Sequence, residues 1–169
     1  MNEILARWNQ MAAEVAAVEI LPCCGSRAWA NGVAGRRPID DEELLLRTSE
    51  QVWRGLGVSD WMESFRSHPR IGQSAAKVSA GVQSRTWSTE EQKKASESND
   101  DITSLAEGNC QYERRFGRIF IVCATGKTST EILEILRRRL QNDDASELYE
   151  AADEQRRITQ IRLRKWLGL

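Results

Sequence analysis

The only histidine of the chain, His68, lies in the segment Ser67-His68-Pro69-Arg70-Ile71-Gly72. An imidazole can donate or accept a proton near neutral pH, because its unperturbed pKa is about 6.5. The proline that follows disfavours the helical conformation at His68, so a helix end or an extended turn is predicted here. A single imidazole on a stiff, irregular stretch of backbone suits acid–base chemistry, although a capping or surface histidine is the plainer explanation.

A second group of candidates follows in Ser88-Thr89-Glu90-Glu91-Gln92. Ser88 as N-cap and Glu91 three residues later form a capping box, which predicts the start of a helix. This structural role is compatible with a chemical one, because the free N–H groups at a helix start attract anions. Glu91 would then act as a base or proton relay, with Gln92 as a hydrogen-bonding neighbour.

Arg162 is a third candidate, on the helix predicted from Ser146 to Leu167. Its helical face also carries, at helical spacing, Leu148, Ala152, Gln155, Ile158 and Trp166. A buried arginine needs a partner, and a structural salt bridge is one explanation of it. The other explanation is that the planar guanidinium binds a carboxylate or a similar anion of a ligand.

The segment Ala124-Thr125-Gly126-Lys127-Thr128-Ser129 resembles the end of a nucleotide-binding loop, because Gly-Lys-Thr follows an apolar run. A complete phosphate-binding loop needs a glycine five residues before Gly126, and that position holds Ile121. A capping box from Thr128 to Glu131 explains the threonine without a ligand. The sequence therefore argues against a nucleotide site.

The composition is that of an ordinary globular protein. The chain has 169 residues, a formal net charge of −1 and 40% hydrophobic residues, so we expect one domain, 1–169, with its own core. Nucleic-acid binding requires a basic surplus that the sequence lacks, and the basic runs 137–139 and 156–157 are interpreted as solvated helix faces. Neither an apolar stretch of about 18 residues nor a signal-peptide pattern is present, which argues against a membrane protein.

The four cysteines, Cys23, Cys24, Cys110 and Cys123, show no metal-binding spacing. There is no Cys-x-x-Cys pair, and a single histidine does not complete a usual zinc site. We therefore expect free thiols in a reducing compartment, and a cytoplasmic protein without bound metal.

Helical patterns dominate the chain. Helices are predicted over Ile4–Val18, from a capping box at Asp40-x-x-Glu43, from Ser59 to the region of His68, over Ser88–Glu107 and Asn109–Phe116, from Thr128 to the break at Asn142-Asp143-Asp144, and over Ser146–Leu167. The polar residues Arg70–Trp87 are predicted to form a long loop. The β-branched run Ile119–Ala124 has strand propensity, but it lacks an obvious partner strand, so a buried extended or irregular segment is expected.

Taken in order, a series of motifs makes the chain resemble one enzyme family. They are Trp8-Asn9, Cys24-Gly25-Ser26-Arg27-x-Trp29, Ser67-His68-Pro69-Arg70-Ile71-Gly72, Trp87-Ser88-x-x-Glu91-Gln92, Asn109-x-x-Tyr112-x-x-x-Phe116-Gly117, Phe120-Ile121-Val122-Cys123-Ala124-Thr125-Gly126-Lys127, Arg139-Leu140-x-Asn142-Asp143, Glu147, and Glu154-Gln155-x-x-Ile158-x-x-x-Arg162-Leu163. Over nearly its whole length, the chain resembles the 2-oxo-4-hydroxy-4-carboxy-5-ureidoimidazoline (OHCU) decarboxylases, which form (S)-allantoin at the end of the route from urate.

The resemblance implies an all-α fold, a single-domain compact bundle of roughly eight to ten helices, forming a homodimer without metal or organic cofactor. It implies a carboxy-lyase in which His68 and Glu91 are catalytic. The substrate-binding residues would be Pro69, Ser88, Gln92, Arg162 and the main chain of Phe120, Ile121, Val122, Cys123 and Ala124. Functional coupling with urate oxidase and 5-hydroxyisourate hydrolase is expected. The alternative is a non-catalytic helical interaction protein.

Overall fold

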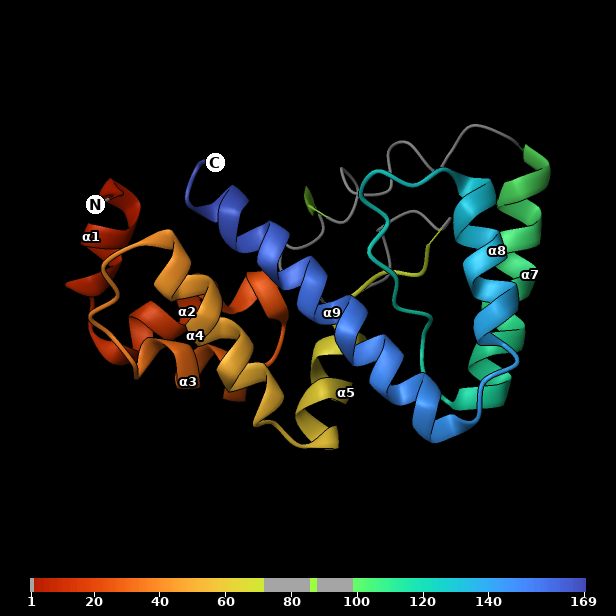
Figure 1. Ribbon diagram of the computed structural model, residues 1–169, viewed down its shortest axis with the longest axis horizontal. Helices are drawn as coiled ribbons and strands as arrows, with labels where there is room; N and C mark the ends of the chain where they lie inside the picture. The colour runs from red at the N-terminus through yellow and green to blue at the C-terminus, as the bar shows by residue number, and fades with distance from the viewer. Residues whose placement is uncertain (1, 72–85, 88–98) are drawn as a thin grey trace. The chain divides into compact units, whose positions relative to one another are not determined.

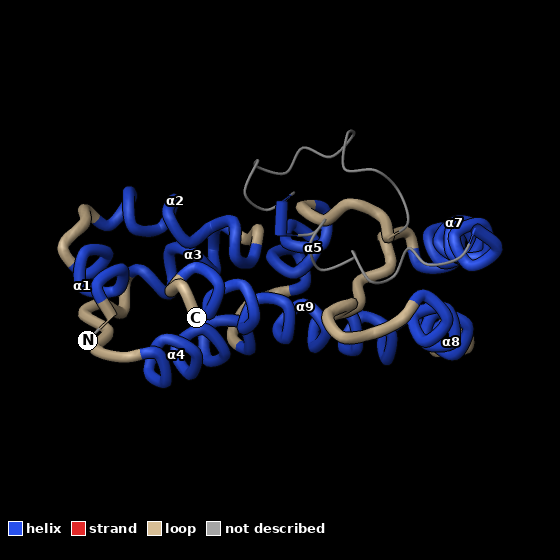
Figure 2. Tube along the Cα trace, turned by 90° about the horizontal axis from the view of Figure 1, so that it is seen from above, coloured by secondary structure: helices blue, strands red, loops and turns tan. Residues whose placement is uncertain are grey.

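A computed structural model of the chain describes residues 2–71, 86–87 and 99–169 (Figure 1). Within these ranges, eight helices have defined bounds: α1 Glu3–Asn9, α2 Ala13–Cys24, α3 Arg27–Ala34, α4 Glu42–Arg54, α5 Val58–Arg66, α7 Asn99–Phe116, α8 Ser129–Arg139 and α9 Asp144–Trp166. The same ranges contain no strand, as Figure 2 shows, which confirms the predicted all-α class. No described helix is both long enough and apolar enough to cross a membrane.

The described chain divides into two compact units. The first comprises Met1–Ser64 together with Arg156–Leu169, and the second comprises Phe65–Gln155. His68 belongs to the second unit and Arg162 to the first. The single domain expected over 1–169 stays a prediction.

In the first unit, the core joins the start of the chain to its end. The Asn2 side chain caps α1 and also donates to the Leu167 carbonyl over 2.9 Å. Trp8 is fully buried, and its ring meets that of Trp166 edge-on at 5.7 Å between centroids. Its indole N–H donates to the Ala16 carbonyl over 2.8 Å, so this large side chain is buried without leaving its one polar group unsatisfied.

The predicted helix Ile4–Val18 is wrong in its continuity, because the chain breaks between α1 and α2. The break exposes backbone carbonyls that a continuous helix would have satisfied. Arg37 fills this need: its Nη1 donates to the carbonyls of Trp8 at 2.6 Å and Met11 at 2.9 Å. The periodicity of the N-terminal segment does not reveal the break, since the residue that stabilises it lies far along the chain.

Two helices start at residues that differ slightly from the predicted ones. The carboxylate that caps α4 is that of Asp41, which accepts the N–H of Leu44 over 2.8 Å, rather than that of Asp40. Helix α5 starts at Val58, so Ser59 lies inside the helix and is not its cap. Adjacent residues of equal capping ability make such boundaries hard to read from sequence.

In the second unit, α7 and α8 pack side by side (Figures 1 and 2). Helix α7 runs unbroken through Gly108, where the sequence pattern placed a boundary between two helices. A Cβ at Gly108 would lie 2.5 Å from Cδ2 of Leu136 in α8, so the glycine permits close helix contact. The capping box Thr128–Glu131 is confirmed. The predicted break is confirmed at Asn142 and Asp143, but Asp144 already belongs to α9, which starts two residues before the predicted Ser146.

The core of this unit is apolar and includes part of the segment between α7 and α8. Its buried residues are Ile71, Leu105, Tyr112, Phe116, Phe120, Val122, Ala124, Ile132, Leu133 and Leu136. The segment after His68 and the run 120–124 therefore pack against the same pair of helices.

We predict that Asp41→Ala lowers the free energy of unfolding by about 1 kcal/mol, the usual cost of losing a helix N-cap. Asp40→Ala is the matched control and is expected to change it by less than about 0.5 kcal/mol, as for an ordinary surface site. Urea denaturation followed by circular dichroism measures both. Equal losses would show that Asp41 is not the cap.

Candidate functional site

His68 lies two residues beyond the end of α5, in an irregular turn. Its backbone N–H donates to the Phe65 carbonyl over 3.1 Å, which closes the last turn before Pro69. His68 as a whole residue is only 9% exposed, and Pro69 is buried too. The predicted helix end is thus confirmed, and a surface histidine is excluded.

Helix α7 holds the chain immediately after His68-Pro69. The Arg70 guanidinium forms a two-pronged ion pair with Glu113, with Nη2 2.7 Å from Oε2. The buried Asn109 amide donates to the Ile71 carbonyl over 2.9 Å. Asn109 and Glu113 are four residues apart, so one face of one helical turn fixes the backbone that follows the imidazole.

Arg162 is fully buried in the first unit, as its place on the apolar face of the last helix predicted. Its Nη1 lies 3.4 Å from the Pro22 carbonyl. Pro22 is in the last turn of α2, where carbonyls lack helical partners and carry the negative end of the helix dipole. The helix end therefore stabilises the buried guanidinium charge and directs it.

The four cysteines are free thiols, as predicted, and only Cys110 is exposed. Burial raises the pKa of Cys24 to about 11, because the thiolate would lose its hydration. Burial also raises the pKa of Cys23, and the nearby Arg162 charge opposes this only in part. These two thiols therefore stay neutral near physiological pH, and neither is a candidate nucleophile.

The predicted substrate-contacting stretch, Phe120–Ala124, is buried throughout, with residue exposures between 2% and 6%. It is neither helix nor strand (Figure 2), so the expected irregular segment is confirmed and the strand alternative is wrong. Buried N–H and C=O groups need partners, and no strand is present among the described residues to supply them. Charged side chains do so instead. Arg139 donates to the Ile121 carbonyl over 2.6 Å, and Glu154 accepts the Cys123 N–H over 2.6 Å.

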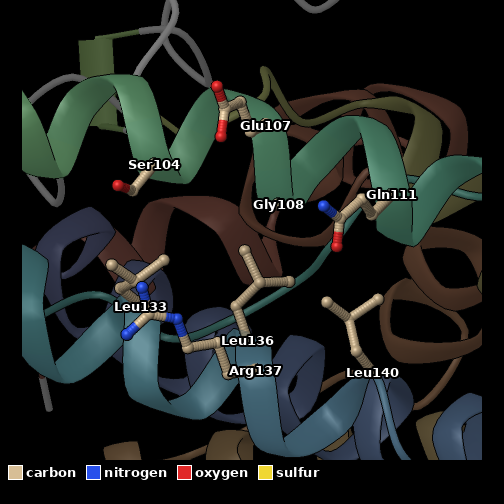
Figure 3. A pocket seen from close by; sticks show the side chains of 8 residues that line it. All are labelled: Ser104, Glu107, Gly108, Gln111, Leu133, Leu136, Arg137 and Leu140. Carbon is tan, nitrogen blue, oxygen red and sulfur yellow. The ribbon is translucent and has the colours of Figure 1, made fainter.

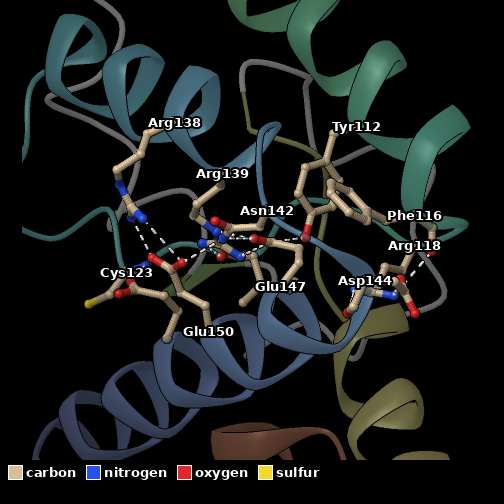
Figure 4. A network of polar contacts seen from close by, with 12 residues as sticks. Tyr112, Phe116, Arg118, Cys123, Arg138, Arg139, Asn142, Asp144, Glu147 and Glu150 are labelled. Carbon is tan, nitrogen blue, oxygen red and sulfur yellow. Dashed lines mark hydrogen bonds and ion pairs between the residues drawn. The ribbon is translucent and has the colours of Figure 1, made fainter.

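Arg139, which donates to this segment, also forms a buried ion pair with Glu147 (Figure 4). Both side chains are fully buried, with Nε 2.9 Å from Oε1. The Tyr112 hydroxyl also donates to Oε1, and the Asn142 amide donates to Oε2 over 2.8 Å. Burial and the hydrogen bond to Glu147 raise the pKa of Tyr112, so its hydroxyl stays a donor.

The structure corrects the prediction that the basic run 137–139 is solvated. Arg137 and Arg138 are exposed, but Arg139 is 0% exposed, and its guanidinium carbon lies 4.7 Å from the Phe120 ring centroid. The signal for this was present in the sequence. Arg139 follows Ile132 and Leu136 at helical spacing, so it continues the apolar face of α8.

A pocket of about 120 Å³ opens between α7 and α8 (Figure 3). Its lining consists of Ser104, Glu107, Gly108, Gln111, Leu133, Leu136, Arg137 and Leu140. None of the predicted site residues lines it. In the part of the chain that the structure describes, no three His, Cys, Asp or Glu side chains gather as metal ligands would.

Three predicted site residues, Ser88, Glu91 and Gln92, lie outside the described residues. Their roles stay predictions, as does a site that His68 and Arg162 share. What the described residues add is local. The imidazole, the guanidinium and the irregular segment are each buried. The backbone of His68, the Arg162 guanidinium and the irregular segment each have a contact within their own unit.

Comparison with known proteins decides the family. The family model described as OHCU decarboxylase matches residues 9–164. The chain belongs to the OHCU decarboxylase family. Within it, the chain is 33% identical to the 2-oxo-4-hydroxy-4-carboxy-5-ureidoimidazoline decarboxylase of Mus musculus, covering 89% of this chain and 82% of that protein.

A plant protein and a solved structure are also similar to the chain. The uric acid degradation bifunctional protein TTL of Arabidopsis thaliana is 35% identical over 92% of this chain, which spans about half (48%) of that protein's length. A crystal structure of OHCU decarboxylase in the presence of (S)-allantoin matches with a TM-score of 0.77 and 33% identity. The match covers 89% of this chain and 98% of that one.

We predict that Arg139→Met costs about 3–5 kcal/mol of unfolding free energy, because it leaves the Glu147 carboxylate buried without its cation. Arg138→Met is the matched control. It removes the neighbouring arginine from an exposed pair with Glu150 and is expected to cost at most about 1 kcal/mol. Chemical denaturation of both variants tests this, and comparable costs would mean that the buried pair does not stabilise the fold.

Proposed function

We propose that the chain decarboxylates 2-oxo-4-hydroxy-4-carboxy-5-ureidoimidazoline to (S)-allantoin. The observation that carries this is the likeness to an OHCU decarboxylase structure obtained with (S)-allantoin, which extends over 89% of this chain at 33% identity. The family match over residues 9–164 and the mouse decarboxylase support the same reaction. The chain would be a carbon–carbon lyase in urate degradation.

The reaction sets two requirements. The substrate carries a carboxylate on a carbon that also bears a hydroxyl group, and loss of carbon dioxide leaves an electron pair that must spread into the ring. The hydroxyl proton is removed as its oxygen becomes a carbonyl, and a proton is added to the carbon that bears the ureido group. Delivery to one face alone gives a single enantiomer.

We assign the proton transfers to His68 and Glu91. His68 is a buried imidazole on a stiff turn that α7 anchors, which favours a fixed orientation toward substrate. Glu91 enters this assignment through the family resemblance. Pro69, Ser88 and Gln92 would contact the substrate around these two groups.

We assign anion binding to Arg162. Water does not screen a fully buried guanidinium, so its charge-assisted bonds to a carboxylate or ring oxygen are strong. The main chain of Phe120, Ile121, Val122, Cys123 and Ala124 would bind the heterocycle, since main-chain N–H groups stabilise charge that develops on ring oxygens.

We further propose a cytoplasmic homodimer that works without metal or organic cofactor. Free thiols support a reducing compartment. Coupling with 5-hydroxyisourate hydrolase and urate oxidase is supported by the Arabidopsis thaliana relative, which is described as a bifunctional protein of uric acid degradation.

We predict that His68→Ala lowers formation of (S)-allantoin at least about 100-fold, the typical worth of general acid–base catalysis. The assay couples urate oxidation and the hydrolase to this enzyme and follows the circular dichroism of the product. Cys110→Ser, an exposed site, is the control, and far-ultraviolet circular dichroism checks the fold. A variant that still makes (S)-allantoin at the parent rate would remove His68 from the mechanism.

We predict that Arg162→Lys raises KM roughly tenfold, because a point charge replaces a planar fork at a cost of about 1.4 kcal/mol of binding. Arg164→Lys, an exposed position on the same helix, is the control and is expected to keep the parent KM. An unchanged KM in Arg162→Lys would mean that this arginine serves the fold alone.

A further inference from the structure

Three successive peptide groups between Ile121 and Ala124 are each held at one end by a charged side chain. In the first, the Ile121 carbonyl accepts a hydrogen bond from Arg139 over 2.6 Å. In the second, the Cys123 N–H donates to Glu154 over 2.6 Å. In the third, the Cys123 carbonyl accepts from Nζ of Lys127 over 2.7 Å. Hydrogen bonds to charged groups are about twice as strong as neutral ones, so the orientation of this loop is firmly set.

The opposite ends of these peptide groups follow from covalent geometry. The peptide bonds of this segment are trans, and in a planar trans peptide the N–H and the C=O point in opposite directions. Holding the Ile121 carbonyl therefore directs the Val122 N–H away from Arg139. Holding the Cys123 N–H directs the Val122 carbonyl away from Glu154, and holding the Cys123 carbonyl directs the Ala124 N–H away from Lys127.

The result is a short row of main-chain groups that reads donor, acceptor, donor: the Val122 N–H, the Val122 carbonyl and the Ala124 N–H. None of the described residues makes a hydrogen bond to these three groups. Val122 and Ala124 are each only 5% exposed, and buried polar groups need partners. A ligand that brings an acceptor, a donor and an acceptor satisfies all three.

We propose that Glu154 and Lys127, together with Arg139, are positioning residues that aim this row at a ureide. Such a ligand presents carbonyl oxygens and N–H groups in alternation along a planar edge. The inference rests on the proposed function, because OHCU and allantoin are both ureides. Glu154 is the most informative of the three, since it sets the peptide whose carbonyl is the only acceptor in the row.

The test compares Glu154→Leu, which removes the acceptor, with Glu154→Gln, whose amide oxygen can accept the same N–H. Glu150→Gln is the matched control, because Glu150 lies one turn earlier on α9 and pairs with Arg138 and Asn142 instead. The readouts are kcat and KM in the coupled assay, the free energy of unfolding, and the exchange rate of the Cys123 amide by nuclear magnetic resonance.

We expect Glu154→Leu to raise KM about tenfold or more, the effect of misdirecting one hydrogen bond to the ligand, and to speed exchange at Cys123. Glu154→Gln should recover most of the KM, and Glu150→Gln should keep the parent value. Lys127→Met tests the next peptide group in the same way if Glu154→Leu does not fold. An unchanged KM in Glu154→Leu would overturn the proposal. A KM that rises in Glu150→Gln as well, in proportion to the loss of unfolding free energy in each variant, would also overturn it.

Failure of the proposed function can be distinguished from failure of the positioning inference. A parent chain that makes no (S)-allantoin rejects that function, and titration with (S)-allantoin then decides the inference. Binding to the parent that weakens in Glu154→Leu and returns in Glu154→Gln supports the positioning role. Absence of binding to the parent, or equal binding to all variants, rejects it.

Discussion

The buried run Phe120–Ala124 imposes the strictest demand on the second unit, because its main chain is removed from water without a neighbouring strand among the described residues. Side chains that are distant in sequence meet this demand. Arg139 donates to the Ile121 carbonyl while Glu147 pairs with its charge within the core, and Tyr112 and Asn142 donate hydrogen bonds to the same carboxylate. The buried ion pair therefore helps to fix the conformation of this irregular segment in addition to any effect on stability.

The same logic applies around the other two candidate groups. The imidazole of His68 follows a helix end, and the chain beyond it is held by Asn109 and Glu113 of α7. The guanidinium of Arg162 faces the carbonyl-rich end of α2 through Pro22. In each case the candidate side chain lies on a stretch of chain that is held by backbone groups or by residues outside its own segment. Irregular backbone carries the candidate imidazole and helix α9 carries the candidate guanidinium, while neighbouring helices supply the contacts that hold the chain around both.

Much of this was predictable from sequence where the information is local. The Thr128 capping box, the break before Asp144 and the burial of Arg162 follow from spacing within one helix. The break after α1 was not predictable, because it depends on Arg37. Arg139 was missed because its charge suggested a solvated face, although its spacing from Leu136 indicated burial. Only the family resemblance pointed to main-chain groups of 120–124, since main-chain chemistry leaves no mark in side-chain type.

Gly108 has an influence beyond its own contact with Leu136. The residue after it in the chain, Asn109, holds the Ile71 carbonyl, so the spacing of α7 from α8 also sets where the backbone next to His68 is fixed. A larger residue at position 108 would thus change the position of the backbone beside His68, although Gly108 itself is not one of the candidate site residues. A position without a side chain thereby helps to fix the backbone beside the candidate imidazole.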